Sequence, residues 1–141
     1  MSQGPENRFI GAINDRIPAV IHREKMFNPY RGGTPDMWYS AKLDLWAEYK
    51  WWASPPKRTA KPLGLSKLQE LWLRRRFEEG RRCVVICGCG TGGIVVQTPL
   101  YWESPIPPTF YNEFFMTRDG IAEWITHVVQ SQSHQADDDT R

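Results

Sequence analysis

The 141-residue sequence contains no long apolar run, only three cysteines and little net charge. A membrane-spanning helix needs about 18 or more consecutive apolar residues, and polar residues interrupt every apolar stretch before that length. The first residues also lack the basic and apolar segments of a secretory signal. These absences predict a protein without a membrane partner that resides in the cytoplasm.

The three cysteines, Cys83, Cys87 and Cys89, lie within one segment of seven residues. An odd number of cysteines without a secretory signal argues against a disulfide framework and for a reducing compartment. A structural zinc site takes four ligands, usually in two pairs, and this segment otherwise has the pattern of a hydrophobic strand. We therefore interpret the cysteines as buried thiols rather than as metal ligands.

Composition and length predict one globular domain. Hydrophobic residues make up 40% of the chain and charged residues 24%, which excludes a disordered chain. We expect the domain over residues 1–130, followed by a polar, disordered tail over residues 131–141. The net charge of +2 hides a basic middle, because eleven lysines and arginines face five acidic residues between Lys42 and Arg82. This surplus fits an anionic partner, nucleic acid first, and equally a solvated helix face.

Hydrophobic periodicity and turn residues predict alternating helices and strands. The expected helices cover residues 5–17, 65–79 and 118–129, and the expected strands cover residues 19–27, 36–40, 44–52, 83–89 and 94–98. Ser66 is expected to cap the second helix, with Leu68, Leu71 and Trp72 on its apolar face. A proline-broken stretch runs to residue 108. The order of elements predicts a single α/β domain with a mixed sheet flanked by helices.

Asp36, Glu48 and Lys50 indicate a chemistry. Side chains alternate along a strand, so Glu48 and Lys50 point to the same face, about 6.5 Å apart. In a hairpin over residues 41–43, Asp36 comes opposite Glu48. Two carboxylates at such a separation suit Mg²⁺, or Mn²⁺ in its place, completed by water and a substrate phosphate. Lys50 can then neutralise charge in the transition state of phosphodiester hydrolysis.

The pattern Pro35-Asp36 followed by Glu48-Tyr49-Lys50 resembles the signature of the PD-(D/E)XK nuclease superfamily. The resemblance implies a restriction-endonuclease-like mixed sheet flanked by helices, with these residues on its central hairpin. Residues 65–69 are similar to the Ser-x-x-Gln helix of VRR-NUC-type and Holliday-junction-resolvase-like members. Residues 28–50 also resemble small phage-type endonucleases of this superfamily, which implies the host-cell cytoplasm if a phage encodes the protein. The resemblance covers residues 6–98.

The resemblance implies roles for further residues. Glu6 matches the N-terminal glutamate of the superfamily and is expected to join Asp36 and Glu48 as a metal ligand. Gln69 is expected to steady Lys50 or to touch the substrate phosphate, which would complete the catalytic set with Asp36, Glu48 and Lys50. The charge pattern adds a set of expected DNA contacts in loops and on the second helix: Arg31, Lys57, Arg58, Lys61, Arg74 and Arg75.

Three functions are compatible with these residues. The first is a Mg²⁺-dependent DNA endonuclease, acting as a homodimer in junction resolution, repair or site-specific homing cleavage of duplex or branched DNA. The second is a non-catalytic nucleic-acid-binding module that retains the nuclease fold. The third is a structural protein in which Glu48 and Lys50 form an ordinary surface pair worth a fraction of a kcal/mol. The presence of Asp36, Glu48 and Lys50 together favours the first.

Overall fold

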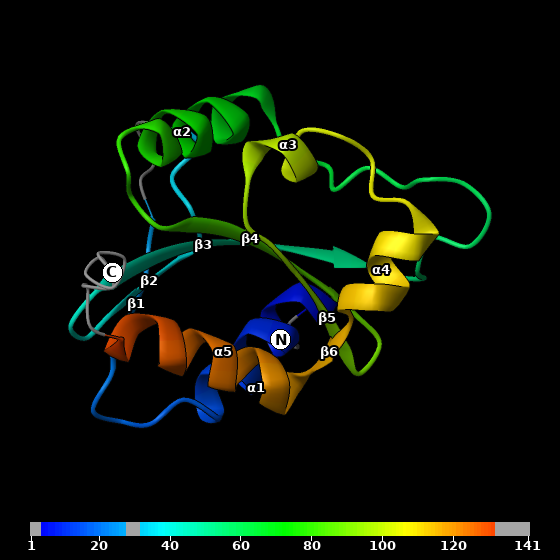
Figure 1. The fold of residues 1–141 in the computed structure, drawn as a ribbon. Coiled ribbons are helices and arrows are strands. Elements are labelled where there is room, and N and C mark those ends of the chain that lie inside the picture. Colours follow the sequence, from blue (N-terminus) through cyan, green and yellow to red (C-terminus); the bar gives the residue numbers. More distant parts are fainter. Residues whose placement is uncertain (1–3, 28–31, 132–141) are drawn as a thin grey trace, which may run out of the picture.

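The computed structural model describes residues 4–27 and 32–131. Arg31 and the expected tail beyond residue 131 therefore lie outside the described residues. The elements are arranged around one sheet (Figure 1) and are, in chain order, α1 (Pro5–Asp15), β1 (His22–Lys25), β2 (Met37–Ser40), β3 (Asp44–Trp52), α2 (Lys67–Glu78), β4 (Cys83–Cys89), β5 (Gly92–Val96), α3 (Pro99–Trp102), α4 (Pro108–Phe114), β6 (Met116–Thr117) and α5 (Arg118–Gln130).

The sheet of the described residues has six strands in the order β1-β2-β3-β4-β5-β6. Strands β3 and β4 pair in parallel, and every other neighbouring pair is antiparallel. Parallel neighbours need a long crossover, which the loop after β3 and helix α2 supply. The sheet is therefore mixed, as the sequence predicts.

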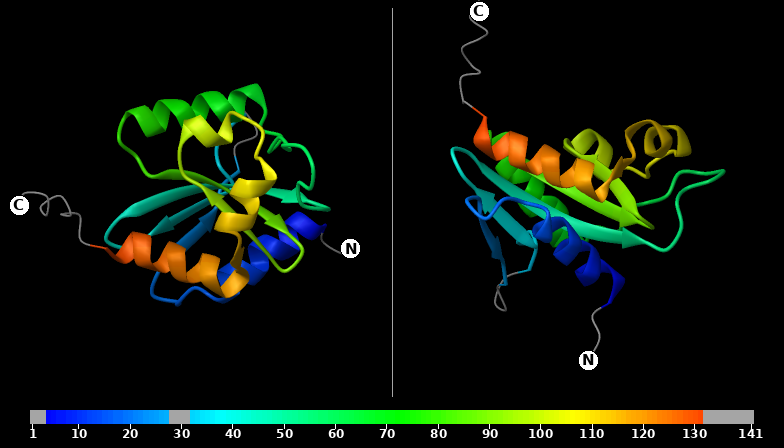
Figure 2. Two further views of the ribbon diagram at one scale, coloured as in Figure 1. Left: turned by 45° about the vertical axis from the view of Figure 1, so that its right-hand side comes forward. Right: turned by 90° about the horizontal axis from the view of Figure 1, so that it is seen from below.

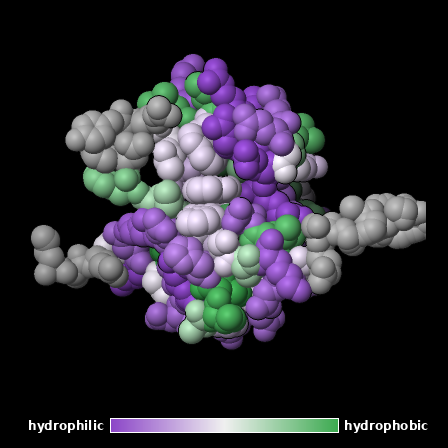
Figure 3. All heavy atoms as spheres, turned by 90° about the vertical axis from the view of Figure 1, so that its left-hand side faces the viewer, coloured by the Kyte–Doolittle hydropathy of each residue, from purple (hydrophilic) through white to green (hydrophobic). Residues whose placement is uncertain are grey.

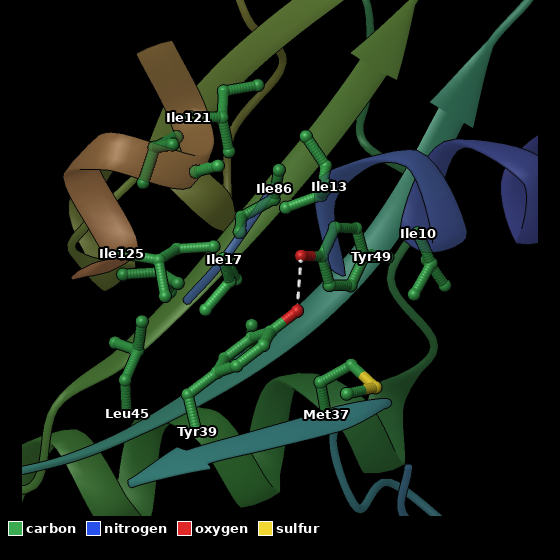
Figure 4. Close-up of a cluster of buried hydrophobic side chains, with 14 of the residues drawn as sticks. Ile10, Ile13, Ile17, Met37, Tyr39, Leu45, Tyr49, Ile86, Ile121 and Ile125 are labelled. Atoms are coloured by element: carbon green, nitrogen blue, oxygen red, sulfur yellow. Dashed lines mark hydrogen bonds between the residues drawn. The ribbon is translucent and has the colours of Figure 1, made fainter. Parts of the chain in front are cut away.

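The sheet separates two hydrophobic clusters. Helices α1 and α5 cover one face, and α2, α3 and α4 cover the other (Figures 1 and 2). Because side chains alternate along β3, Leu45, Ala47 and Tyr49 enter the cluster under α1 and α5. Figure 4 shows the hydroxyl groups of Tyr39 and Tyr49 meeting inside this cluster, 2.8 Å apart. The even-numbered residues of β3 therefore face α2.

The cysteines and most strands match the sequence-based expectations. Strand β3 has the predicted bounds, and every residue of β4 is buried because helices cover both faces of this central strand. Cys83, Cys87 and Cys89 are free and buried. Burial raises the pKa of the Cys83 thiol to about 12, so the expected buried thiols are confirmed.

Three local predictions are wrong. The apolar face of α2 is not Leu68 and Leu71, which are 56% and 45% exposed, because the helix turns Leu73 into the core instead. The stretch after β5 contains two short helices, since Pro99 and Pro108 occupy the first helical turns, where proline is favourable. The first strand is limited to His22–Lys25, because a turn with a hydrogen bond from Ile21 to the Pro18 carbonyl precedes it.

Candidate functional site

The β2–β3 hairpin brings the two predicted carboxylates together. Met37 pairs with Ala47, so the same register places Asp36 opposite Glu48. The backbone N–H of Tyr49 donates to Asp36 Oδ2 at 2.9 Å. Burial raises the pKa of Asp36, while this hydrogen bond and the nearby lysines oppose the rise. The hairpin thus holds two carboxylates side by side where β2 begins.

Glu48 is the only charged residue among the described residues that is fully buried, with 2% of its surface exposed. Its Oε2 accepts a hydrogen bond from Gln69 Nε2 at 2.9 Å and lies 3.7 Å from Lys50 Nζ. Its Oε1 is buried and has no hydrogen-bond partner within the described residues. Burial and the charge of Asp36 raise the pKa of Glu48 to about 8, against the opposing charge of Lys50. One carboxylate oxygen is therefore available to a further ligand.

Gln69 belongs to the first turn of α2. Ser66 caps this helix as predicted, and Gln69 closes a capping box with it. The amide of Gln69 contacts Glu48 rather than Lys50, the first of its two expected partners. Its expected contact with the substrate phosphate stays a prediction. Gly33, with a φ of 95°, lets the loop before Asp36 lie directly against the Leu68 carbonyl, where a Cβ would collide. The loop, the helix and the carboxylate pair thus meet at one place.

Glu6 reaches the same cluster from the first turn of α1. Burial raises its pKa, the charge of Asp36 raises it further, and the lysines Lys50 and Lys25 lower it. Glu6 is therefore within electrostatic range of Asp36, although α1 covers the other face of the sheet, and its role as a third metal ligand stays a prediction. Lys25, at the end of β1, also acts on Asp36. It is not among the residues predicted from the sequence, because a lysine in an edge strand carries no signal of a site.

The residues at this site fit a hard divalent cation in part. Within the described ranges, no three His, Cys, Asp or Glu side chains are close enough to form a metal centre by themselves. Mg²⁺, however, usually keeps several waters and takes one or two carboxylates from the protein. The buried Oε1 of Glu48 beside Asp36 provides such oxygen ligands, and a cation there would remove the cost of an unpaired buried oxygen.

The expected DNA contacts of the loop after β3 are not equivalent. Lys57 and Arg58 are exposed, and they line an open hollow formed by residues 55–62. Lys61 donates to the Ser54 carbonyl at 2.8 Å and lies over the Trp52 ring, 5.6 Å from its centroid. Lys61 therefore holds the loop, whereas Lys57 and Arg58 extend from it.

The expected contacts on α2 differ in the same way. Arg74 forms hydrogen bonds to both oxygens of Glu103, at 2.6 and 2.9 Å, and an ion pair with Glu78 at 3.2 Å. These two carboxylates offset its charge. Arg75 is exposed on the next position of the helix. Figure 3, which views the left-hand side of Figure 1, shows a dense group of hydrophilic side chains at the height of α2.

The raised pKa of Glu48 makes the stability of the metal-free protein pH-dependent. The folded protein keeps the Glu48 proton up to about pH 8, while the unfolded chain loses it near 4.5. The folded state then binds more protons, so the free energy of unfolding falls as pH rises through this window, by at most about 1.4 kcal/mol per pH unit. We expect Glu48→Gln to have a flatter dependence and to be more stable than the wild type at pH 8.

The measurement is urea unfolding in EDTA from pH 4.5 to 8. The matched control is Glu123→Gln, which removes an exposed carboxylate from α5 and should leave the wild-type pH dependence unchanged. Parallel curves for the wild type and Glu48→Gln would show that Glu48 is ionised at neutral pH in the folded protein.

No protein-family model and no curated protein matches this chain. Among solved structures, it is similar to a Holliday junction resolvase, Hjc, from the archaeal hyperthermophile Archaeoglobus fulgidus. The likeness has a TM-score of 0.57 at 12% identity and covers 85% of this chain and 97% of the resolvase. None of the helices in the described ranges is long and apolar enough to span a bilayer. The mixed α/β fold of this chain is therefore similar to that of the archaeal resolvase, which confirms the predicted fold class.

Proposed function

We propose that this protein is a divalent-metal-dependent DNA endonuclease of the PD-(D/E)XK type. The observation that carries the proposal is the buried Glu48 carboxylate, opposite Asp36 and beside Lys50, with one oxygen that has no partner within the described residues. Perturbed carboxylates of this kind cluster at catalytic sites. An ordinary surface pair would be exposed and worth little, so the burial of Glu48 argues against the purely structural alternative.

Each residue of the cluster has a part in the proposed reaction. Asp36 and Glu48 would hold Mg²⁺ or Mn²⁺, and Glu6, whose charge acts on Glu48, would contact the cation through a water molecule. When bound, the cation would polarise a phosphoryl oxygen and lower the pKa of an attacking water. Lys50, with 20% of its side chain exposed, can orient that water and neutralise charge on the phosphorus. The water oxygen bonds to phosphorus as a phosphorus–oxygen bond of the backbone breaks, leaving a hydroxyl and a phosphate end.

The resolvase fold supports branched DNA as the substrate class. The similar archaeal protein is described as a Holliday junction resolvase. We therefore favour structure-selective cleavage over repair nicking or site-specific homing cleavage. The phage-type context suggested by residues 28–50 is a part of this proposal that rests on the sequence pattern alone.

The first test removes each catalytic group. We expect Asp36→Asn, Glu48→Gln and Lys50→Ala each to lower cleavage by about 10²-fold or more, because no other group can replace the missing ligand or charge. DNA binding in Ca²⁺ should survive. The measurements are nicking of plasmid and of junction DNA with Mg²⁺, Mn²⁺ or EDTA, and a gel shift in Ca²⁺.

The matched control is Asp44→Asn. Asp44 lies at the start of the same strand and accepts a hydrogen bond from Trp38 Nε1 at 3.2 Å, which asparagine can also accept. This variant should cleave like the wild type. Normal nicking by Glu48→Gln would contradict the proposal, and binding without cleavage by the wild type would favour the non-catalytic module.

We further propose that Lys57 and Arg58 bind the DNA backbone beside the active site. Their loop follows β3 directly, so it projects from the strand that carries Glu48 and Lys50. Prolines in the loop and the Lys61 contact to Ser54 restrict its motion, which lowers the entropic cost of binding. Arg75 extends this surface, whereas Arg74 contributes less because Glu103 and Glu78 offset its charge.

The double variant Lys57→Ala/Arg58→Ala should bind DNA more weakly and with a weaker salt dependence. The slope of log K against log salt should become shallower by about 0.9 for each duplex phosphate that the variant no longer neutralises. The control, Lys42→Ala/Arg82→Ala, removes two exposed cations from the opposite end of β3 and β4. Fluorescence anisotropy across a salt series measures both. If the two double variants have the same slope, the loop does not bind the DNA backbone.

We also propose a homodimer, which would place two active sites on opposite strands of one substrate. Helices α3 and α4 and the residue after them carry exposed apolar side chains: Leu100, Tyr101, Phe114 and Phe115, exposed by 71%, 45%, 48% and 37%. Contiguous exposed apolar surface favours association. The ring of Phe110 joins Tyr101 and Phe114 into one surface, with centroids 5.1 and 4.8 Å apart.

The double variant Leu100→Glu/Phe114→Glu should be monomeric, because dimerisation would bury two unpaired carboxylates in each subunit. It should still nick DNA but no longer make paired cuts. Val20→Glu is the control, since Val20 is 80% exposed and lies outside α3 and α4, in the segment between α1 and β1. Sedimentation velocity measures the oligomeric state. A monomeric wild type, or a double variant that still dimerises, would contradict this surface.

A further inference from the structure

The first turn of α2 is connected to the buried carboxylate of Glu48 by a single side chain. Ser66 Oγ accepts a hydrogen bond from the backbone N–H of Gln69 at 3.1 Å. In return, the backbone N–H of Ser66 donates to Gln69 Oε1 at 2.9 Å. Gln69 Nε2 then donates to Glu48 Oε2 at 2.9 Å. Three hydrogen bonds in series thus run from the start of the helix to the carboxylate.

The capping box determines which end of the Gln69 amide faces Glu48. Of the two ends of the Gln69 amide, only the oxygen can accept a hydrogen bond from the backbone N–H of Ser66. The amide nitrogen must therefore point toward Glu48. With the amide reversed, its nitrogen would face the backbone N–H of Ser66, and this contact between two donors would be repulsive. The cap therefore ensures that Gln69 presents a donor to Glu48.

The donor in turn orients the carboxylate. Glu48 Oε2 is occupied by Gln69 and lies near Lys50, while Oε1 has no partner within the described residues. If Gln69 were free to rotate, Oε1 and Oε2 could exchange places or share the same donor. The capping box thus keeps one oxygen, Oε1, away from Gln69 and available to the proposed cation.

We propose that Ser66 is a positioning residue for cleavage: its hydroxyl holds the backbone of Gln69 and its backbone N–H holds the Gln69 amide. Through this amide it orients the carboxylate of Glu48 without touching DNA or metal. This inference rests on the proposed nuclease function. Hydrogen-bond partners of metal ligands orient the ligand, and their removal typically lowers metal affinity or activity by about 10- to 100-fold. Ser66 acts on the ligand Glu48 only through Gln69, so we expect metal affinity to fall by about 10-fold, the lower end of this range.

Removal of the cap should leave the body of α2 in place. Leu73 is fully buried in the core, and Trp72 packs against Trp46 of β3, with ring centroids 5.7 Å apart. These contacts anchor the helix beyond its first turn. A Ser66→Ala protein should therefore fold, with greater freedom at the first turn and at Gln69.

The experiment compares Ser66→Ala with Thr117→Ala. Thr117 caps α5 by accepting from the Gly120 N–H at 3.1 Å, and α5 lies on the face of the sheet opposite to α2 (Figure 1). Both variants lack one helix cap of the same kind. Ser66→Thr restores a capping hydroxyl and should behave as the wild type does.

Two readouts separate positioning from stability. The first needs no metal: hydrogen exchange of the Gln69 side-chain amide, followed by NMR, should become faster in Ser66→Ala and not in Thr117→Ala. The second is direct Mn²⁺ binding, measured by paramagnetic resonance, which should weaken about 10-fold in Ser66→Ala alone. Nicking of junction DNA should fall in parallel and recover partly when Mg²⁺ is raised.

The outcomes are distinguishable. If Ser66→Ala and Thr117→Ala show the same exchange and the same Mn²⁺ affinity, Ser66 is a helix cap and nothing more, while the nuclease proposal stands. If the wild type neither binds Mn²⁺ nor cleaves DNA, the nuclease proposal falls and this inference falls with it. Faster exchange together with weaker Mn²⁺ binding in Ser66→Ala supports the positioning role.

Discussion

Glu48 is a carboxylate that the fold holds inside the protein, with 2% of its surface exposed. Removing such a charge from water costs several kcal/mol unless opposite charges and hydrogen bonds compensate. In this chain the compensation comes from Lys50 and Gln69, and it is incomplete, because burial raises the pKa of Glu48 to about 8. One of its oxygens also has no partner among the described residues. Burying Glu48 in this way destabilises the fold, so this residue is better explained by the binding of a ligand than by a contribution to stability.

The pair of carboxylates could be predicted because it depends on short-range structure. A three-residue link between two alternating strands fixes the register, and the register places Asp36 opposite Glu48. Strand alternation also separates Tyr49 from its neighbours on the other face. These features follow from a short stretch of consecutive residues, so the sequence alone was sufficient for them and for the mixed sheet.

Contacts between distant elements could not be predicted in this way. The Gln69 amide faces Glu48 because α2 crosses the sheet at a particular place, which Leu73 and Trp72 determine by packing. The helical periodicity alone favoured Leu68, Leu71 and Trp72 as the apolar face; the structure packs Trp72 against the core and exposes the two leucines. The two short helices after β5 were not predicted because prolines usually interrupt helices, whereas here both prolines begin one.

The rigidity of the site comes from the opposite face of the sheet. Tyr49 has its side chain in the closed core, where its hydroxyl meets that of Tyr39, which also donates to Asn14 of α1 at 2.7 Å. The backbone N–H of Tyr49 donates to Asp36 and so holds this carboxylate at the site. Tyr49 therefore connects the core with the site: the core fixes its ring, and its peptide N–H fixes the carboxylate of Asp36. Groups that hold a reacting phosphate, as proposed for this site, need such support, and a central strand packed on both faces provides it.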